Sequence, residues 1–412
     1  MHSTEPAGPV PSSAEPADPA EPAGPAAQRG PTRFGTFHAP YHGIDGNPAL
    51  QLRRDIDLVR HLDALGFDEA WIGEHHSAGY ETVASPEVFI AAAAEHTRRI
   101  RLGTGVNSLP YHHPLILADR IMQLDQQTTG RVMLGAGPGQ LASDAFMMGI
   151  DPLRQRAMMG EALDVIVRLL RGETVTARTD WFELAEARLQ LRPCRPEGIE
   201  LAVASSVSPT GSVHAGRHGI GLLSLAAAAP AGLDALAANW AVYERTCAEH
   251  GHTPDRRTWR LVLPMHLAET EAEARTQAEY GVLHVVRYLE GLSGRSLPYG
   301  RSAADAVKQW TTEGYPVFGV ATIGSPADAI ARIEAMTAAT GGFGTLLIAD
   351  MPLCAPEAKR RSYELFAEHV IPHCTAANLG RTASMAWAHT NSERFVGAMG
   401  DAVRAAVESG GR

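Results

Sequence analysis

The sequence predicts an α/β protein with the fold of a (β/α)8 TIM barrel carrying insertions. Short runs of β-branched and other apolar residues alternate with longer segments of helical periodicity between residues 33 and 375. This strand-then-helix unit occurs eight times at an even spacing, and such units build parallel sheets through right-handed crossovers. An open doubly wound sheet also satisfies the pattern, but the count of eight and the even spacing favour the closed barrel.

The eight predicted strands are short and rich in β-branched or other apolar residues. They cover residues 33–39, 69–75, 101–109, 131–137, 199–205, 221–226, 260–267 and 344–349. Residues 174–191 lack helical periodicity and are expected to form a β excursion outside the series.

The helices between these strands have recognisable beginnings and ends. Pro86 and Pro114 stand where a helix begins, a position at which the missing N–H of proline costs nothing. Gly66 follows the first helix and is a suitable C-terminal glycine. The predicted helices cover residues 50–65, 86–97, 114–127, 161–170, 210–218, 231–250, 271–289, 326–339 and 356–370.

The chain divides into three predicted regions. Residues 1–32 contain eight of the 27 prolines and few apolar residues, which indicates a disordered Pro/Ala-rich tail. Residues 33–375 form the barrel, and residues 376–412 are expected to be a C-terminal appendage, either a short helix or a frayed segment. The first residues lack a basic segment followed by an apolar one, so no secretion or import signal is expected.

Composition narrows the class of protein. Lys and Arg number 36 against 46 Asp and Glu, a net charge of −10, so no basic surface is expected for binding nucleic acid. The four cysteines form no CxxC pair, which disfavours a disulfide framework and favours the reducing cytoplasm. No apolar stretch reaches the roughly 18 residues that a membrane-spanning helix needs, so no membrane association is expected.

The active site of a TIM barrel lies at the C-terminal ends of its strands. Polar and small residues collect at these positions in the sequence. They are His38, His75, His76, Asn107, Ser108, residues 137–140, residues 205–211, Ser224, His266 and Asp350.

The segment Ser-Ser-Val-Ser-Pro-Thr-Gly, residues 205–211, follows the fifth strand and leads into a helix. Hydroxyls and free N–H groups at the start of a helix bind anions, so this loop is a candidate phosphate site. An ordinary helix cap, with Ser208 as the capping residue and Pro209 as the first helical residue, remains the alternative.

Two histidine pairs are candidates for proton transfer. His75 and His76 follow the second strand, and a histidine can donate or accept a proton near neutral pH. Neighbours on an extended segment point to opposite sides, so at most one of them faces the pocket. Each of the four, His112 and His113 included, could instead brace a loop. Neither pair has HExxH spacing, so no metal site is expected.

The glycines of residues 135–139 differ from a dinucleotide-binding fingerprint. Their spacing is GxGxG, Pro138 lacks the N–H that a phosphate would use, and no helix begins at once. They could instead let a flat ligand approach the backbone. The sequence also lacks a GxSxG elbow and a Walker loop, so hydrolase and kinase functions lose their usual support.

Several stretches in unbroken order resemble the bacterial-luciferase-like flavin-dependent monooxygenase superfamily, and look most similar to its limonene-monooxygenase-type branch. The resemblance extends over residues 33–375. It is carried by FDEAWIGEHH at residues 67–76, RLGTGV at 101–106, SLPYHHP at 108–114, LD at 124–125, GR at 130–131, GAG at 135–137 and ASSVSPTG at 204–211.

The resemblance implies a luciferase-like barrel that receives reduced FMN, or FAD, from a separate flavin reductase that uses NAD(P)H. In this family the reduced flavin reacts with O2 through a flavin 4a-hydroperoxide to oxygenate an organic substrate, here a small hydrophobic molecule. A homodimer is expected. Two alternatives remain, a deazaflavin-dependent hydride-transfer enzyme of the same superfamily and a non-catalytic flavin-binding subunit.

The resemblance also implies roles for individual residues. His75 matches the active-site histidine, and Gly105-Val106 matches a non-proline cis peptide beneath the flavin ring. The cofactor-binding residues expected here are Gly105, Val106, Asn107, Gly137, Ser205, Ser206, Thr210 and Gly211.

Three positions depart from luciferase itself. Gly137 and Pro138 stand where luciferase has a cysteine and a phosphate-binding arginine, and Ser205 replaces its glutamate. Other groups must therefore balance the charge of the phosphate, and luminescence is not implied. Residues 290–317, rich in Gly and Ser, are expected to be either an irregular lid, in which Tyr299, Trp310 and Tyr315 supply apolar cover for the site, or a disordered loop.

Overall fold

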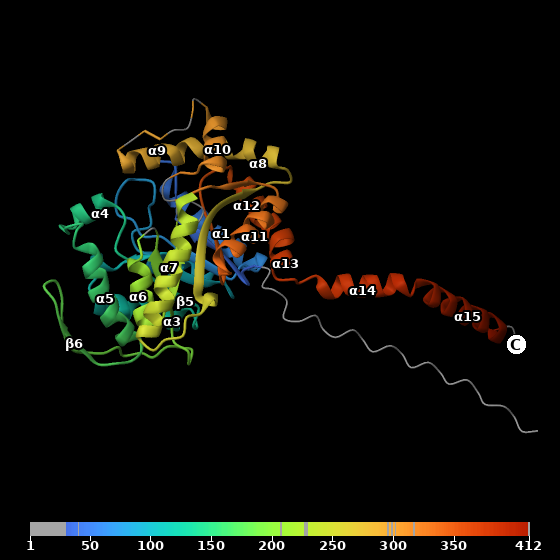
Figure 1. The fold of residues 1–412 in the computed structure, drawn as a ribbon, viewed down its shortest axis with the longest axis horizontal. Helices are drawn as coiled ribbons and strands as arrows, with labels where there is room; N and C mark the ends of the chain where they lie inside the picture. The colour runs from blue at the N-terminus through green and yellow to red at the C-terminus, as the bar shows by residue number, and fades with distance from the viewer. Residues whose placement is uncertain are drawn as a thin grey trace, which may run out of the picture.

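The computed structural model describes residues 30–39, 41–206, 208–225, 230–294, 296–297, 300, 302–315 and 318–410 (Figure 1). Eight parallel strands form a closed ring in the order β1, β2, β3, β5, β8, β9, β10 and β12, and β12 returns to β1. The predicted TIM barrel is therefore confirmed. The barrel strands are β1 (Arg33–His38), β2 (Glu69–Ile72), β3 (Arg101–Thr104), β5 (Val132–Gly137), β8 (Glu200–Ser205), β9 (Gly221–Ser224), β10 (Trp259–Leu267) and β12 (Thr345–Ala349).

Helices surround this ring, and most of them begin within a few residues of their predicted starts. An exception is the helix predicted over residues 161–170, which begins earlier, at Gln155. The surrounding helices are α1 (Pro48–Leu65), α2 (Pro86–Glu95), α3 (Pro114–Gln127), α5 (Gln155–Leu170), α6 (Thr210–His218), α7 (Pro230–Glu249), α11 (Pro326–Thr340) and α12 (Pro356–Leu365).

Local sequence explains the boundaries of α1. The Asn47 side chain accepts hydrogen bonds from the backbone N–H groups of Ala49 and Leu50 at 3.0 and 3.3 Å, which satisfies two donors at the start of the helix. Gly66 ends the helix with φ of 90°, in the left-handed region that glycine adopts without strain. The predicted C-terminal glycine is confirmed.

The pleat of each strand separates two cores. On β2, Ala70 and Ile72 belong to the apolar layer between the barrel and the helices, whereas Trp71 belongs to a cluster that includes Met133 and Val262. Successive side chains on a strand point to opposite faces, so one face fills the barrel and the other binds the helices.

Smaller elements complete the fold. The β excursion predicted over residues 174–191 is an antiparallel hairpin, which lies at the end of the molecule away from α9 (Figure 1). The hairpin and the remaining short elements are β4 (Asn107–Ser108), β6 (Val175–Arg178), β7 (Glu183–Ala187), β11 (Thr322–Gly324), α4 (Ala142–Met147) and α13 (Ile371–Cys374).

Two predictions about the region after β10 are wrong. The continuous helix expected over residues 271–289 is two helices, α8 (Glu271–Ala278) and α9 (Val282–Ser293). The break occurs at Gly281, whose N–H donates to the carbonyl of Leu353 at 2.9 Å and whose Cα lies so close to the chain after β12 that an added Cβ would be 1.6 Å from the carbonyl oxygen of Pro352. Residues 290–317, expected to be irregular, contain helix α10 (Ala303–Thr312), capped by Ser302 and Asp305.

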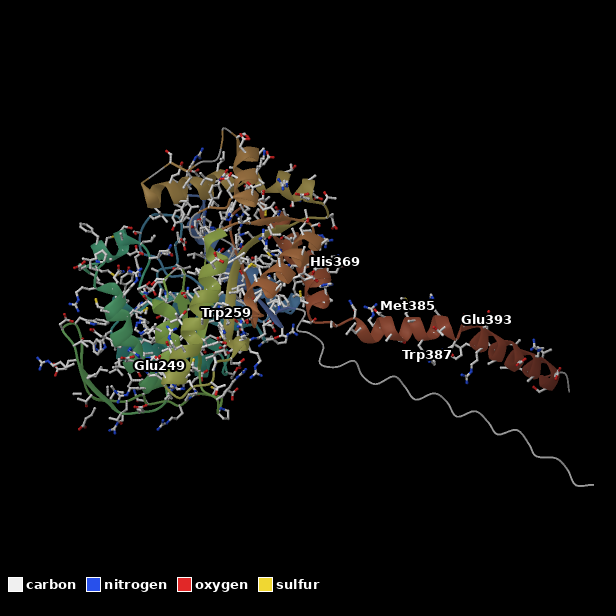
Figure 2. All side chains as sticks on the ribbon, in the orientation of Figure 1. Glu249, Trp259, His369, Met385, Trp387 and Glu393 are labelled. Carbon is white, nitrogen blue, oxygen red and sulfur yellow. The ribbon has the colours of Figure 1, made fainter. Side chains whose placement is uncertain are left out.

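The structure describes little of the predicted N-terminal tail and all but the last two residues of the predicted C-terminal appendage. Residues 1–29 of the predicted tail lie outside the described residues, while Gly30 and Pro31 are buried. The C-terminal region forms two helices, α14 (Leu379–Thr390) and α15 (Ser392–Gly410), rather than one short helix, and both project away from the barrel (Figure 1). Met385 and Trp387 stand out from α14 with about three-fifths of their surface exposed (Figure 2). Among the described residues, none of the helices is both long and apolar enough to cross a membrane.

Candidate active site

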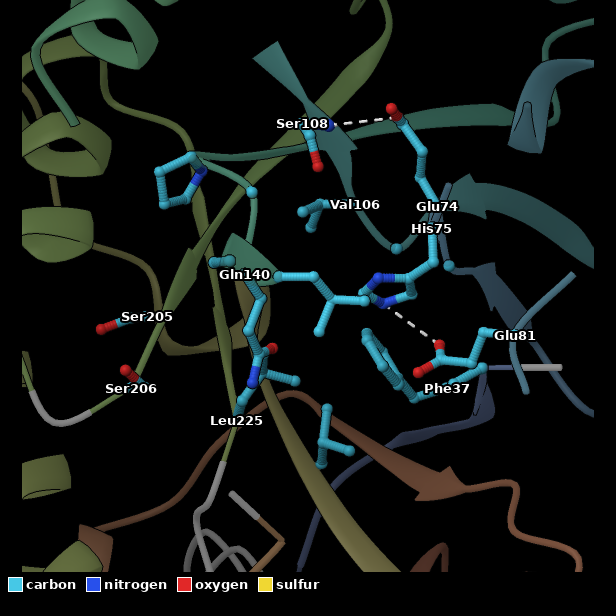
Figure 3. Close-up of a pocket in the computed structure, with 18 of the residues that line it drawn as sticks. Phe37, Glu74, His75, Glu81, Val106, Ser108, Gln140, Ser205, Ser206 and Leu225 are labelled. Atoms are coloured by element: carbon cyan, nitrogen blue, oxygen red, sulfur yellow. Dashed lines mark hydrogen bonds and ion pairs between the residues drawn. The ribbon is translucent and has the colours of Figure 1, made fainter. Parts of the chain in front are cut away.

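A cavity of about 460 Å3 lies at the C-terminal ends of the barrel strands (Figure 3). Seven of the nine predicted site residues line it, namely His75, Gly105, Val106, Ser205, Ser206, Thr210 and Gly211. The other two, Asn107 and Gly137, contact residues of the wall. Figure 3 shows His75 and Glu81 on one side of the cavity and Ser205 and Ser206 on the other.

One wall is formed by the peptide between Gly105 and Val106, which is cis, as the resemblance implied. Glycine at two positions allows this wall to form. A Cβ on Gly105 would lie 2.9 Å from Cβ of Trp71, and a Cβ on Gly137 would lie 2.4 Å from Cγ2 of Val106. Gly137 therefore acts on the cavity through the placement of Val106.

Glu74 holds together the loops after β2 and β3. Its Oε2 accepts hydrogen bonds from Asn107 Nδ2 at 3.0 Å and from the N–H of Ser108 at 3.1 Å. Its Oε1 lies 2.9 Å from Nε2 of His112 and 3.0 Å from Nε2 of His76. Burial raises the pKa of Glu74, but these histidines and the backbone N–H outweigh burial and lower it to about 2. The Glu74 carboxylate is thus ionised and holds the two loops together. His76 and His112 bond to it and therefore brace the loops, which was the alternative to a role in proton transfer.

His75 points into the cavity between two acidic side chains. Its Nε2 lies 3.1 Å from Oε2 of Glu81 (Figure 3). Its Nδ1 lies 3.6 Å from Oδ2 of Asp144. Burial lowers the pKa of His75, but the carboxylates of Glu81 and Asp144 outweigh burial, so that its pKa is raised. Because His76 instead turns to Glu74, only one member of the pair faces the cavity, as the extended segment predicts.

The loop before α6 presents several hydroxyl groups to the opposite side of the cavity. Ser208 and Thr210 lie there with their hydroxyl oxygens 2.9 Å apart, and α6 begins at Thr210. A Cβ on Gly211 would lie 2.3 Å from the carbonyl oxygen of Ala204, so glycine lets the first turn of the helix pack against the end of β8. The loop therefore combines hydroxyls with the free N–H groups of a helix start.

Arg156 is a functional candidate that the sequence reasoning missed. It lies in the first turn of α5 and lines the same cavity as the hydroxyl loop. Its guanidinium supplies a positive charge where the sequence left the phosphate charge unbalanced. No motif surrounds Arg156, and only the fold brings it to the loop, which lies about fifty residues later in the chain.

The remaining wall of the cavity is apolar, but two of the aromatic residues predicted to cover the cavity are not part of it. Trp310 and Tyr315 are buried in the core that α9 and α10 share and do not line the cavity, because their rings pack on each other at 5.3 Å. Tyr299 lies outside the described residues. The apolar lining residues are Phe37, Ala39, Tyr41, Leu225, Val262, Pro264, Leu289, Leu292 and Phe318.

Comparisons with known proteins agree with this geometry. The family model for luciferase-like monooxygenases matches residues 32–342. Limonene 1,2-monooxygenase of Rhodococcus erythropolis is 48% identical over 340 residues, which are 82% of this chain and 86% of the relative. The 4-hydroxyprotoasukamycin monooxygenase of Streptomyces nodosus subsp. asukaensis is 44% identical over 357 residues, 86% of this chain and 95% of the relative.

A solved structure extends the likeness to the fold. The oxygenating constituent of 3,6-diketocamphane monooxygenase from Pseudomonas putida, a type II Baeyer-Villiger monooxygenase in complex with FMN, superimposes with a TM-score of 0.68. It is 25% identical, and the match covers 83% of this chain and 98% of that one. The resemblance stated from the sequence motifs is thereby confirmed, and the chain belongs to the family of luciferase-like monooxygenases.

Proposed function

We propose that this chain is a flavin-dependent monooxygenase that binds reduced FMN in the cavity and uses O2 to oxygenate a small hydrophobic organic substrate. One observation carries the proposal: the same cavity is lined by the hydroxyl loop and Arg156, by a set of apolar side chains, and by His75. The monooxygenase relatives and the FMN-bound structural neighbour support the same assignment.

The residues present fit the cofactor. Ser205, Ser206, Thr210 and the start of α6 would hold the phosphate through hydroxyls and backbone N–H groups, and Arg156 would balance its charge. On the ring side, Gly105 and Val106 line the cavity and would form the surface against which the flat ring lies. Bound reduced FMN supplies the electrons that activate O2.

The protein's own side chains would supply protection and a proton. Leu289, Leu292 and Phe318 form an apolar wall that excludes water, which matters because water promotes the release of peroxide in place of oxygen transfer. His75 is placed to hold a proton at the cavity wall. The apolar lining favours a hydrocarbon or ketone substrate over a charged one.

The finer assignments are also proposals. A separate flavin reductase that uses NAD(P)H would deliver the reduced cofactor. The four cysteines are free thiols, which suits a cytoplasmic enzyme. A homodimer is proposed as well, and the exposed apolar side chains of Val396, Met399 and Val403 on α15 support a contact with a second copy.

Anaerobic titration tests the proposal. The purified protein is titrated with reduced FMN, reduced FAD and reduced deazaflavin, and oxygen is then admitted with limonene as the probe substrate. Tight binding of reduced FMN and oxygen uptake that yields an oxygenated product are expected. Binding of the deazaflavin alone would instead indicate a hydride-transfer enzyme, and flavin binding without oxygen uptake would indicate a non-catalytic subunit.

A further inference from the structure

We propose that Glu81 and Tyr288 are positioning residues that hold His75 as an oriented imidazolium, so that His75 enters the reaction as a proton donor rather than as a base. The inference rests on the proposed function, because the donor role requires a reaction in the cavity that takes up a proton. It adds to that function two positioning residues, Glu81 in the same loop as His75 and Tyr288 on α9, and a protonation state for the histidine.

The contacts form a chain across three separate segments. The Tyr288 hydroxyl on α9 donates to Oε1 of Glu81 at 2.7 Å, and Oε2 of Glu81 lies 3.1 Å from Nε2 of His75. Asp144 on α4 faces the other ring nitrogen of His75 at 3.6 Å. The two carboxyl oxygens of Glu81 thus have different partners, and the imidazole is held from both sides.

Burial makes these contacts strong. Glu81 is 7% exposed, Tyr288 4% and Asp144 1%, so little water screens the charges. A buried carboxylate beside a histidine is stabilised by a positive charge on the ring, and Glu81 would otherwise remain an unpaired buried charge.

The proton of the Glu81–His75 pair lies on His75 for two reasons. Burial raises the pKa of Glu81, and the charge on His75 together with the hydrogen bond from the Tyr288 hydroxyl acts against burial in favour of the carboxylate form. Asp144 adds a second negative charge next to the ring, and its own pKa is lowered, against the effect of burial, by the nearby His75 ring and by hydrogen bonds from Ser77 and the N–H of His76.

Further titratable groups surround His75. Glu74 adds a third negative charge at longer range and raises the pKa of His75 further, while His76 is occupied by Glu74. Tyr41 packs edge-on against Tyr288 with ring centroids 4.6 Å apart and has a pKa raised by burial, so it stays neutral and fixes the Tyr288 ring. The surroundings are therefore acidic or neutral on each side except at His76.

The protonation state can be measured without any cofactor. Flavin-free protein is prepared with isotope-labelled histidine, the ring signal of His75 is identified by its loss in His75→Gln, and its titration is followed by NMR across neutral pH. In the wild-type protein the midpoint is expected above the ordinary value of 6.5.

Variants separate charge from shape. Glu81→Gln keeps the size and hydrogen-bonding capacity of the side chain but removes its charge, and is expected to lower the midpoint toward 6.5, whereas Glu81→Asp keeps the charge and should keep the midpoint raised. Tyr288→Phe should lower the midpoint by less than Glu81→Gln does. Tyr80→Phe is the matched control, because Tyr80 packs against Tyr288 at 5.1 Å while the hydroxyl bonded to Glu81 is left in place.

The outcomes decide the inference independently of the proposed function. A wild-type midpoint at or below 6.5, or a Glu81→Gln midpoint equal to that of the wild type, overturns it. If Glu81→Gln does not fold, Tyr288→Phe against Tyr80→Phe carries the test. Should reduced FMN fail to bind while the titrations follow the expected order, the proposed function is wrong and the placement of the proton on His75 stands.

Discussion

Arg260 and Glu69 pair inside the barrel near the N-terminal ends of their strands, with Arg260 Nε 2.7 Å from Glu69 Oε2 and Arg260 Nη2 3.0 Å from Glu69 Oε1. Both side chains are 0% exposed, and Arg260 also bonds Glu200 and lies over the Trp71 ring. This end of the barrel is therefore closed by a bidentate ion pair, while the opposite end carries the cavity.

Arg260→Met is expected to destabilise the fold strongly. The substitution removes the buried guanidinium from Glu69, which keeps only the partly exposed Arg33 at 3.2 Å, and breaking a buried pair in this way costs about 3–5 kcal/mol. Urea unfolding followed by circular dichroism measures the change. The same substitution at Arg257, whose pair with Asp255 is exposed, should have a much smaller effect; equal losses in the two variants would contradict the assignment.

Gly211→Ala is expected to weaken the binding of FMN by about tenfold or more, equivalent to about 1.4 kcal/mol. The added methyl group would lie 2.3 Å from the carbonyl oxygen of Ala204, so the first turn of α6 must move away from the phosphate loop. Fluorescence titration gives the dissociation constant. Gly380→Ala on α14 meets no atom within 4 Å and should bind FMN like the wild type. Unchanged FMN affinity in Gly211→Ala would argue against a phosphate site here.

Arg156→Met should lower the affinity for FMN by about tenfold while leaving riboflavin binding nearly unchanged, because a charge-assisted bond to phosphate contributes about 1.5–3 kcal/mol. The salt dependence of FMN binding should decrease as well. Arg178→Met on the distant hairpin is the control. A parallel loss of FMN and riboflavin binding would show that Arg156 shapes the pocket instead of contacting the phosphate.

His38 is expected to make stability fall at alkaline pH. Its ring lies 3.0 Å from Asp350 and 3.5 Å from Asp55. Burial lowers the pKa of His38, but the two carboxylates outweigh burial and raise it to about 9. A raised folded-state pKa gives stability that is fully present below the unfolded value of 6.5 and is lost as pH rises through 9.

The pH dependence is checked by measuring the free energy of unfolding from neutral to alkaline pH. His38→Gln should flatten this dependence, and His373→Gln, at a more exposed pair with Glu334, should retain the decline. A wild-type protein whose stability stays constant between these pH values would refute the role of His38.

Sequence predicted the elements whose information is local. The strand from Arg33 and the helix from Pro114 were placed to within a residue or so, because apolar periodicity and proline act over a few positions. The position of the hydroxyl groups of residues 205–211 beside the start of a helix could be predicted for the same reason. A helix start presents free N–H groups whatever surrounds it.

What sequence did not predict depends on contacts across the chain. Glu81 and Tyr288 are 207 positions apart, and no spacing rule connects them. Trp310 looked suitable as a lid because of its size, but the core that α9 and α10 share buries it completely. Arg156 stands in an otherwise ordinary helix, and only the folded barrel brings it to the cavity that the hydroxyl loop also lines.

Gly281 gives the apolar wall of the cavity a fixed reference point. The Cα of Gly281 packs against the carbonyl group of Pro352, and its N–H donates a hydrogen bond to the carbonyl oxygen of Leu353. The start of α9 is therefore held by backbone atoms just after β12 and not by side chains. Leu289 and Leu292, about two and three turns further along the helix, line the cavity. A side chain at position 281 would therefore displace the wall that Leu289 and Leu292 form without any change in the lining residues themselves.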